Sequence, residues 1–132
     1  MDKPSNKRRV QQREPRSGMY ERQDIALIIG NLRAGGAQRV LTTLANSWAS
    51  RGLKVCVVTL ANDEDDFFTL DAGVNRYALG VTSNSSTILG AVWANLVRLA
   101  ALRRAVRNSR APVCVAFVTI TGILAIISTL GL

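Results

Sequence analysis

Two adjacent glycines, Gly35 and Gly36, are the residues whose type and position best fit a chemical role. They follow the apolar run 25–29 and precede a segment with helical periodicity. Glycine has no side chain to hold a ligand away from the backbone, and it tolerates positive φ angles in a turn. The N–H groups at a helix start carry partial positive charge and bind anions. The pattern therefore predicts that Gly35, Gly36 and Ala37 face a phosphate or another anion, although a turn selected only for packing fits equally well.

Two well-known phosphate-binding patterns do not fit this loop. Gly30 and Gly35 have the spacing of a P-loop, but Gly36 and Ala37 stand where that loop needs Lys followed by Ser or Thr. The dinucleotide pattern G-x-G-x-x-G requires a second glycine, and Leu32 stands at that offset. The sequence therefore favours neither a P-loop NTPase nor a nicotinamide enzyme.

Metal and thiol chemistry have few candidates. The chain has no histidine, and Cys56 and Cys114 both lie in apolar runs, which excludes zinc sites and Cys-His nucleophiles. The segment 62–66 is acidic but lacks the spacing of a calcium loop, so it is interpreted as a solubilising surface loop. No metal and no cofactor are expected.

Apolar runs without alternation predict strands that are covered on both faces of a parallel sheet. The expected strands are 25–29, 54–60 and 113–118, with a short further strand at 74–79 that is not a continuous apolar run, and the expected helices are 36–51, 88–107 and a further one from 123. Gly52 is placed to end the first helix, and Ser85 or Ser86 to cap the second. This alternation predicts an α/β fold with a parallel Rossmann-like sheet in strand order 3-2-1-4 and a crevice at the carboxyl ends of strands one and four.

That strand order makes a prediction about the two thiols. Strand one would separate Cys56 from Cys114 by about 9 to 10 Å. This distance exceeds the reach of a disulfide. Both cysteines are therefore expected to be free, buried and structural.

The net charge of +8 is unevenly distributed. Residues 1–24 carry seven basic and four acidic groups, and residues 98–110 carry five arginines and no acid. Aromatic residues make up only 5% of the chain and none lies among the arginines, so nucleic-acid binding is not expected. The arginines fit either a solvated helix face or attraction to an anionic membrane surface or a phosphorylated acceptor. They are Arg98, Arg103, Arg104, Arg107 and Arg110.

The longer string around the glycines is more specific than the pair alone. It begins at Asn31-Leu32, continues through 35–41 (GGAQRVL), and includes Arg51-Gly52 and 55–60. It resembles the opening of family 4 glycosyltransferases, which have the GT-B fold and share a loop ending in GGAERV and the phrase RGHEV before strand two. The resemblance covers residues 25–132. Gln38 replaces the usual Glu, and Leu53-Lys54 replace His-Glu.

The resemblance implies the amino-terminal, acceptor-side part of a retaining enzyme. Such an enzyme transfers a hexosyl or related group from a nucleotide-sugar, which is a substrate and not a cofactor, to a glycan or lipid-linked acceptor. Gly35, Gly36 and Ala37 would face the donor phosphates or sugar, and Arg33, Thr119 and Thr121 would lie on the acceptor side. The E-x7-E carboxylates of the family belong to a second domain, so catalytic residues remain unassigned and this fragment alone is expected to be inactive.

The chain is expected to have two parts in a cytoplasmic protein that binds peripherally to the inner face of the membrane. Residues 1–23 are predicted to form a disordered basic tail without signal-peptide features, and residues 24–132 an incomplete GT-B amino-terminal domain. The alternative is a small membrane protein anchored by residues 113–132. That run is uncharged, long enough to span a bilayer and preceded by arginines, although its threonines and glycines lower its apolarity.

Overall fold

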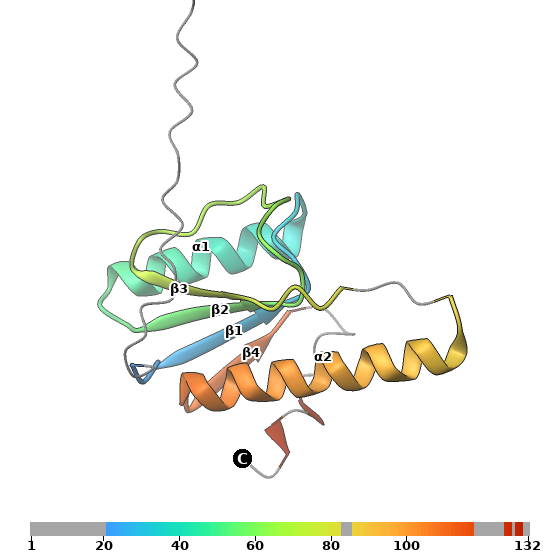
Figure 1. Ribbon diagram of the computed structural model, residues 1–132. Helices are drawn as coiled ribbons and strands as arrows, with labels where there is room; N and C mark the ends of the chain where they lie inside the picture. The colour runs from blue at the N-terminus through green and yellow to red at the C-terminus, as the bar shows by residue number, and fades with distance from the viewer. Residues whose placement is uncertain (1–20, 83–85, 118–125, 128, 131–132) are drawn as a thin grey trace, which may run out of the picture.

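The computed structural model describes residues 21–82, 86–117, 126–127 and 129–130. Within them, a four-stranded parallel sheet lies between two helices (Figure 1). The elements in chain order are β1 (Ile25–Ile29), α1 (Gly36–Ser50), β2 (Val55–Thr59), β3 (Val74–Ala78), α2 (Ile88–Ser109) and β4 (Val113–Ala116). The strands are arranged β3-β2-β1-β4. The predicted α/β class and strand order are confirmed, and both are consistent with part of a GT-B domain.

β1 is a central strand, and its position explains its sequence. Leu27 packs under α1 with Leu41 and Ala45, and the next residue, Ile28, packs on the opposite face with Leu102 of α2. The five side chains named in these two contacts, from β1, α1 and α2, are fully buried. Because helices cover both faces here, β1 is apolar at successive positions instead of alternating.

The helix boundaries have local causes. Gly52 has a φ of 90°, and the N–H groups of Gly52 and Leu53 donate to the carbonyls of Ala49 (3.0 Å) and Trp48 (3.2 Å). A left-handed glycine with these bonds ends α1, as predicted. The start of α2 differs from the prediction, since Thr87 is the cap residue and its Oγ1 accepts from the Gly90 N–H at 3.2 Å.

β4 is not the buried strand that its apolar sequence predicts. Val113 is 49% exposed, and Cys114 and Ala116 are also exposed. β4 is an edge strand of the described sheet, and the core beneath α2 is centred on β1 and β2. The apolar sequence therefore predicted the type of element correctly but not how far it is covered.

The two cysteines occupy one row of the sheet. Ala26 pairs with Cys56 on one side and with Cys114 on the other, and both cysteines are free, so the prediction that strand one lies between two free cysteines is confirmed. Cys56 is buried as expected, but Cys114 is exposed, and the prediction of two buried thiols is wrong for Cys114 because β4 lies at the edge.

Both ends of the chain extend outside the described residues. Gln23, assigned to the tail from sequence, is 1% exposed, and its N–H donates to the Ser109 carbonyl at 2.9 Å. Of the alternative anchor 113–132, Val113–Ala116 form a sheet strand, contrary to a membrane-spanning helix through them, and 118–125 lie outside the described residues. In the described part of the chain, no helix is long and apolar enough to cross a membrane.

Candidate functional site

The glycine loop lies at the carboxyl end of β1. β1 ends at Ile29, and the chain then turns back to start α1 at Gly36, with Gly35 as the cap residue. Gly35, Gly36 and Ala37 are therefore at the edge of the sheet where ligands bind in open parallel α/β proteins.

The structure corrects the reason for a glycine at position 35. Gly35 has φ 175° and ψ 161°, which is extended backbone, so the predicted use of positive φ in this turn is wrong. A Cβ added to Gly35 would lie 2.3 Å from Oε1 of Gln38, which is the end of a flexible side chain. A larger residue at position 35 would displace the Gln38 side chain.

Gly36 is in a different environment. Apart from its chain neighbours and the backbone of its own helix, a Cβ added there would meet no atom of the described chain within 4 Å. No side chain caps α1, and its first turn carries no acidic residue. Because the first N–H groups of a helix have no acceptor within the helix, they are available to a ligand in this open space. Together these properties suit an anion.

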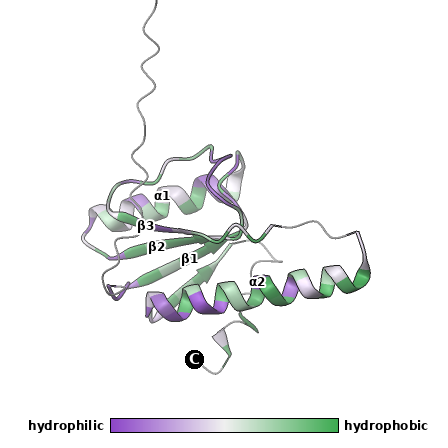
Figure 2. Cartoon of the chain, in the orientation of Figure 1, coloured by the Kyte–Doolittle hydropathy of each residue, from purple (hydrophilic) through white to green (hydrophobic). Residues whose placement is uncertain are grey.

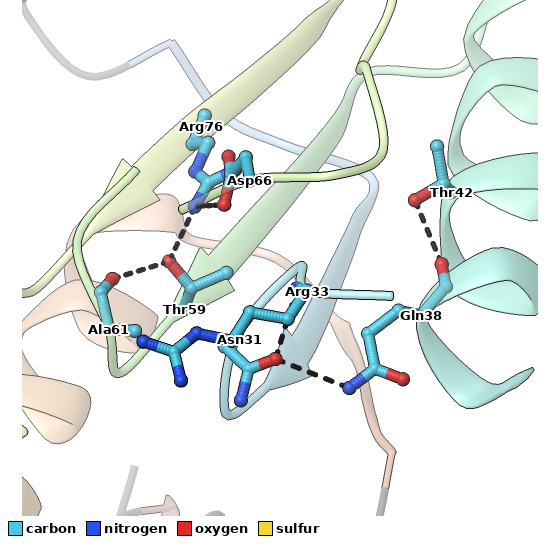
Figure 3. A network of polar contacts seen from close by, with 8 residues as sticks. All are labelled: Asn31, Arg33, Gln38, Thr42, Thr59, Ala61, Asp66 and Arg76. Atoms are coloured by element: carbon cyan, nitrogen blue, oxygen red, sulfur yellow. Dashed lines mark hydrogen bonds and ion pairs between the residues drawn. The ribbon is translucent and has the colours of Figure 1, made fainter. Parts of the chain in front are cut away.

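A side-chain contact joins the glycine loop to the first turn of α1 (Figure 3). Asn31 Oδ1 accepts from the Arg33 N–H at 3.1 Å and from Gln38 Nε2 at 3.3 Å. The sequence reasoning missed this contact. Gln38 stands three residues after the cap residue, where a capping box has Glu or Gln, but its hydrogen bond goes to the Asn31 side chain and not to the cap residue.

A second polar network holds the loop after β2 against the sheet (Figure 3). Arg76 of β3 forms an ion pair with Asp66, and its Nη2 donates to Asp66 Oδ1 and to Thr59 Oγ1, both at 3.1 Å. Thr59 Oγ1 in turn donates to the Ala61 carbonyl at 2.9 Å. Burial raises the pKa of Asp66, and the adjacent Arg76 opposes this shift. The signal in the sequence was an isolated arginine within a short strand.

Asp65, the neighbour of Asp66, contacts the predicted site residue Arg33. Their side chains form an ion pair between the two loops, and each is 65% exposed. Asp65 and Asp66 therefore have structural partners, and the interpretation of 62–66 as only a solubilising loop is wrong for these two. Thr119 and Thr121 lie outside the described residues.

The five arginines predicted to share one helix face have separate environments. Arg98 donates from Nε to the Val81 carbonyl at 3.0 Å, and Arg103 donates from Nη1 to the Leu130 carbonyl at 2.7 Å. Arg104, Arg107 and Arg110 are exposed. In the described residues, no group of three or more acidic, cysteine or histidine side chains is arranged to hold a metal ion.

A parallel sheet with a glycine-led helix start at the carboxyl end of a central strand defines the class of Rossmann-like α/β proteins. Comparison with family profiles matches residues 35–131 to the glycosyl transferase 4-like domain. This match covers most of the chain, so the protein belongs to that family and the resemblance to family 4 glycosyltransferases is confirmed. A search of curated proteins finds no match.

Proposed function

We propose that this chain forms the amino-terminal, acceptor-side wall of a retaining glycosyltransferase that uses a nucleotide-sugar. The observation that carries the proposal is the uncapped start of α1, open in front of Gly36, within a glycosyltransferase domain. Gly35, Gly36 and Ala37 face the donor phosphates or the transferred sugar. The glycan or lipid-linked acceptor lies on the side of Arg33, Thr119 and Thr121. The nucleotide-sugar is the substrate, and no further cofactor is needed.

The backbone at the α1 start would act on the leaving group. Breaking the bond between sugar and diphosphate leaves negative charge on the departing nucleoside diphosphate. N–H groups that are already oriented stabilise this charge without reorganising during the reaction. The space in front of Gly36 is open, and the phosphates would occupy it. A side chain at position 36 would project into that same space.

Direct binding tests this assignment, with inorganic pyrophosphate as the probe and amide chemical shifts of the purified chain as the readout. We expect the largest shifts at Gly35, Gly36 and Ala37, and loss of binding in Gly36→Val. Gly73→Ala is the matched control, since its new Cβ would make only an ordinary 3.6 Å contact with Ala49 and lies outside the loop. Unchanged binding by a folded Gly36→Val variant would show that Gly36 is not part of the anion site.

The same proposal predicts that residues 1–132 alone do not transfer sugar. The sequence contains no glutamate pair with E-x7-E spacing, and retaining transfer needs donor groups held in a closed cleft. We expect no hydrolysis or transfer when the purified chain is incubated with a panel of nucleotide-sugars. Turnover above that of a Gly35→Ala/Gly36→Val variant would contradict this.

A stripe of exposed apolar and basic side chains on α2 supports a second proposed partner. This partner is an anionic membrane at the cytoplasmic face. Helical spacing places Leu89, Trp93, Leu96, Arg104 and Arg107 along one face, and all of them are exposed. Figure 2 shows apolar residues gathered towards the start of α2 and hydrophilic residues towards its end. Apolar side chains, a tryptophan and adjacent arginines are the composition of helices that lie in the interface of anionic bilayers.

Co-sedimentation with vesicles tests this partner. The chain should bind vesicles that contain phosphatidylglycerol more strongly than pure phosphatidylcholine vesicles, and Arg104→Glu/Arg107→Glu should abolish the difference. Arg51→Glu is the control, because Arg51 is also exposed but follows α1 on the other face of the sheet. Equal binding to both vesicle types would argue against the membrane partner.

A further inference from the structure

We propose that the groove between β3 and α2 binds a single-chain lipid with an oxyanion head group, and that Arg104 holds this head group. The groove has a volume of about 280 Å³ and is lined by Tyr77, Leu79, Ala101, Arg104, Ala105 and Asn108. The inference goes beyond the proposed function, because this groove lies on the α2 face of the sheet and the anion site at Gly36 belongs to α1 on the other face.

The groove exists because small side chains of α2 face an edge strand. Tyr77 and Leu79 are two residues apart and lie on one face of the sheet, where the Leu79 N–H extends the ladder by donating to the Thr59 carbonyl at 2.9 Å. Ala101 and Ala105 are four residues apart and lie on one face of α2. The core beneath α2 is centred on β1 and β2, so the space between α2 and β3 is left open.

The inner wall of the groove is apolar. Tyr77, Leu79 and Ala105 are partly buried and pack against the core cluster beneath α2. The volume is close to the lower limit of small-ligand sites, about 300 Å³, whereas a helix with its side chains is about 10 Å across. The groove therefore fits one extended apolar chain better than a segment of a partner protein.

The rim of the groove is basic. Arg104 is exposed, and Asn108 follows it by four residues on the same side of α2, so a guanidinium and an amide NH₂ can donate to the same oxyanion. None of the ion pairs among the described residues involves Arg104. No acidic residue follows Asp71 in the sequence, so α2 has no carboxylate to neutralise this arginine. Charge complementarity thus favours an anionic head group beside the apolar chain.

Titration calorimetry with decyl phosphate tests the charged part of the site, with each ligand kept below its micelle concentration and no vesicles present. Wild type should bind decyl phosphate more tightly than decyl maltoside, which has the same chain with an uncharged head, and more tightly than inorganic phosphate. Arg104→Gln should weaken decyl phosphate binding about tenfold, because it removes charge-assisted hydrogen bonds. Arg51→Gln is the matched control, since it removes the same charge from an exposed position after α1 and should bind like wild type.

A larger side chain in the groove tests the apolar part. Ala101→Leu should fill the space, so we expect decyl phosphate affinity to fall at least tenfold while the unfolding temperature stays the same or rises. Ala100→Leu is the control, because Ala100 is exposed on the same helix and does not line the groove. Loss of ligand binding together with retained stability distinguishes a binding site from a gap in the packing.

Three results would overturn the inference. They are no binding of decyl phosphate by wild type, equally tight binding of decyl maltoside or inorganic phosphate, and unchanged affinity in the folded Ala101→Leu and Arg104→Gln variants. None of these results would affect pyrophosphate binding at Gly36, which involves the opposite face of the sheet, so this inference and the proposed donor site can fail separately.

Discussion

Cys56 and Cys114 pair with the same residue, Ala26, yet their thiols should differ in reactivity. Burial raises the pKa of Cys56 to about 12, with a smaller contribution from the neighbouring Cys114 thiol. Partial burial also raises the pKa of Cys114, but that residue is exposed. Because the thiolate is the nucleophile, the buried thiol should be inert at pH 8.

We therefore predict that N-ethylmaleimide modifies Cys114 and spares Cys56 in the native chain. Peptide mass spectrometry should find one label per molecule at pH 8 and two labels in denaturant. Cys114→Ser should remove native labelling. Comparable labelling of Cys56 in the folded chain would mean that the β2 region opens more readily than its burial indicates.

The ion pair between Arg76 and Asp66 should contribute to stability because both side chains are largely buried, at 18% and 20% exposure. Arg76→Met would leave a carboxylate whose desolvation is no longer offset, and we expect a loss of roughly 1–3 kcal/mol in the free energy of unfolding. Urea denaturation measures this.

A second ion pair in the same chain provides the control for that measurement. Arg33→Met breaks the pair between Arg33 and Asp65, whose side chains are each 65% exposed, and should cost less than about 1 kcal/mol. Equal losses in the two variants would show that burial does not distinguish the pairs.

At the scale of elements, the sequence pattern predicted four strands and their order. Three of the runs were short and unalternated, whereas 74–79 contains Asn75 and Arg76, and the helices after β1 and β3 favoured parallel pairing. The sequence did not show how much of β4 is buried, because the exposure of β4 depends on which elements pack over it. The contacts of Gln38 and Arg76 were missed for a related reason, since each joins segments whose approach is determined by the fold. The residue type likewise did not indicate that the backbone of Gly35 is extended.

The start of α2 gives a prediction for a single element. Thr87 Oγ1 accepts the Gly90 N–H, and replacement of such a cap by alanine typically costs about 1 kcal/mol. Thr87→Ala should therefore lower the unfolding free energy by about that amount. Ser86→Ala is the control, because Ser86 is exposed and is not the cap residue. A larger effect at Ser86 would place the cap one residue earlier.

At the scale of the whole molecule, large apolar side chains are exposed along α2 and near the carboxyl end. Leu89 and Trp93 of α2 are 85% and 70% exposed, and Ile126 near the carboxyl end is 65% exposed. Large exposed apolar side chains such as these promote association in water. We predict that the purified chain self-associates at micromolar concentration, and that Leu89→Glu/Trp93→Glu shifts it towards monomer in sedimentation velocity. Phe67→Glu is the control, since Phe67 is 69% exposed on a loop outside this helix and should have little effect.

The order of the strands also determines when the sheet can be completed during synthesis on the ribosome. β1 pairs with β2 soon after both emerge, but its other neighbour, β4, ends at Ala116, 57 residues after the end of β2. At about 5–20 residues per second, one edge of β1 stays open for roughly 3 to 11 seconds in every newly made chain. In that interval the unpaired backbone N–H and C=O groups along one edge of Ile25–Ile29 are exposed to neighbouring nascent chains and to chaperones. Codons that slow translation between β2 and β4 would lengthen this interval, and faster ones would shorten it.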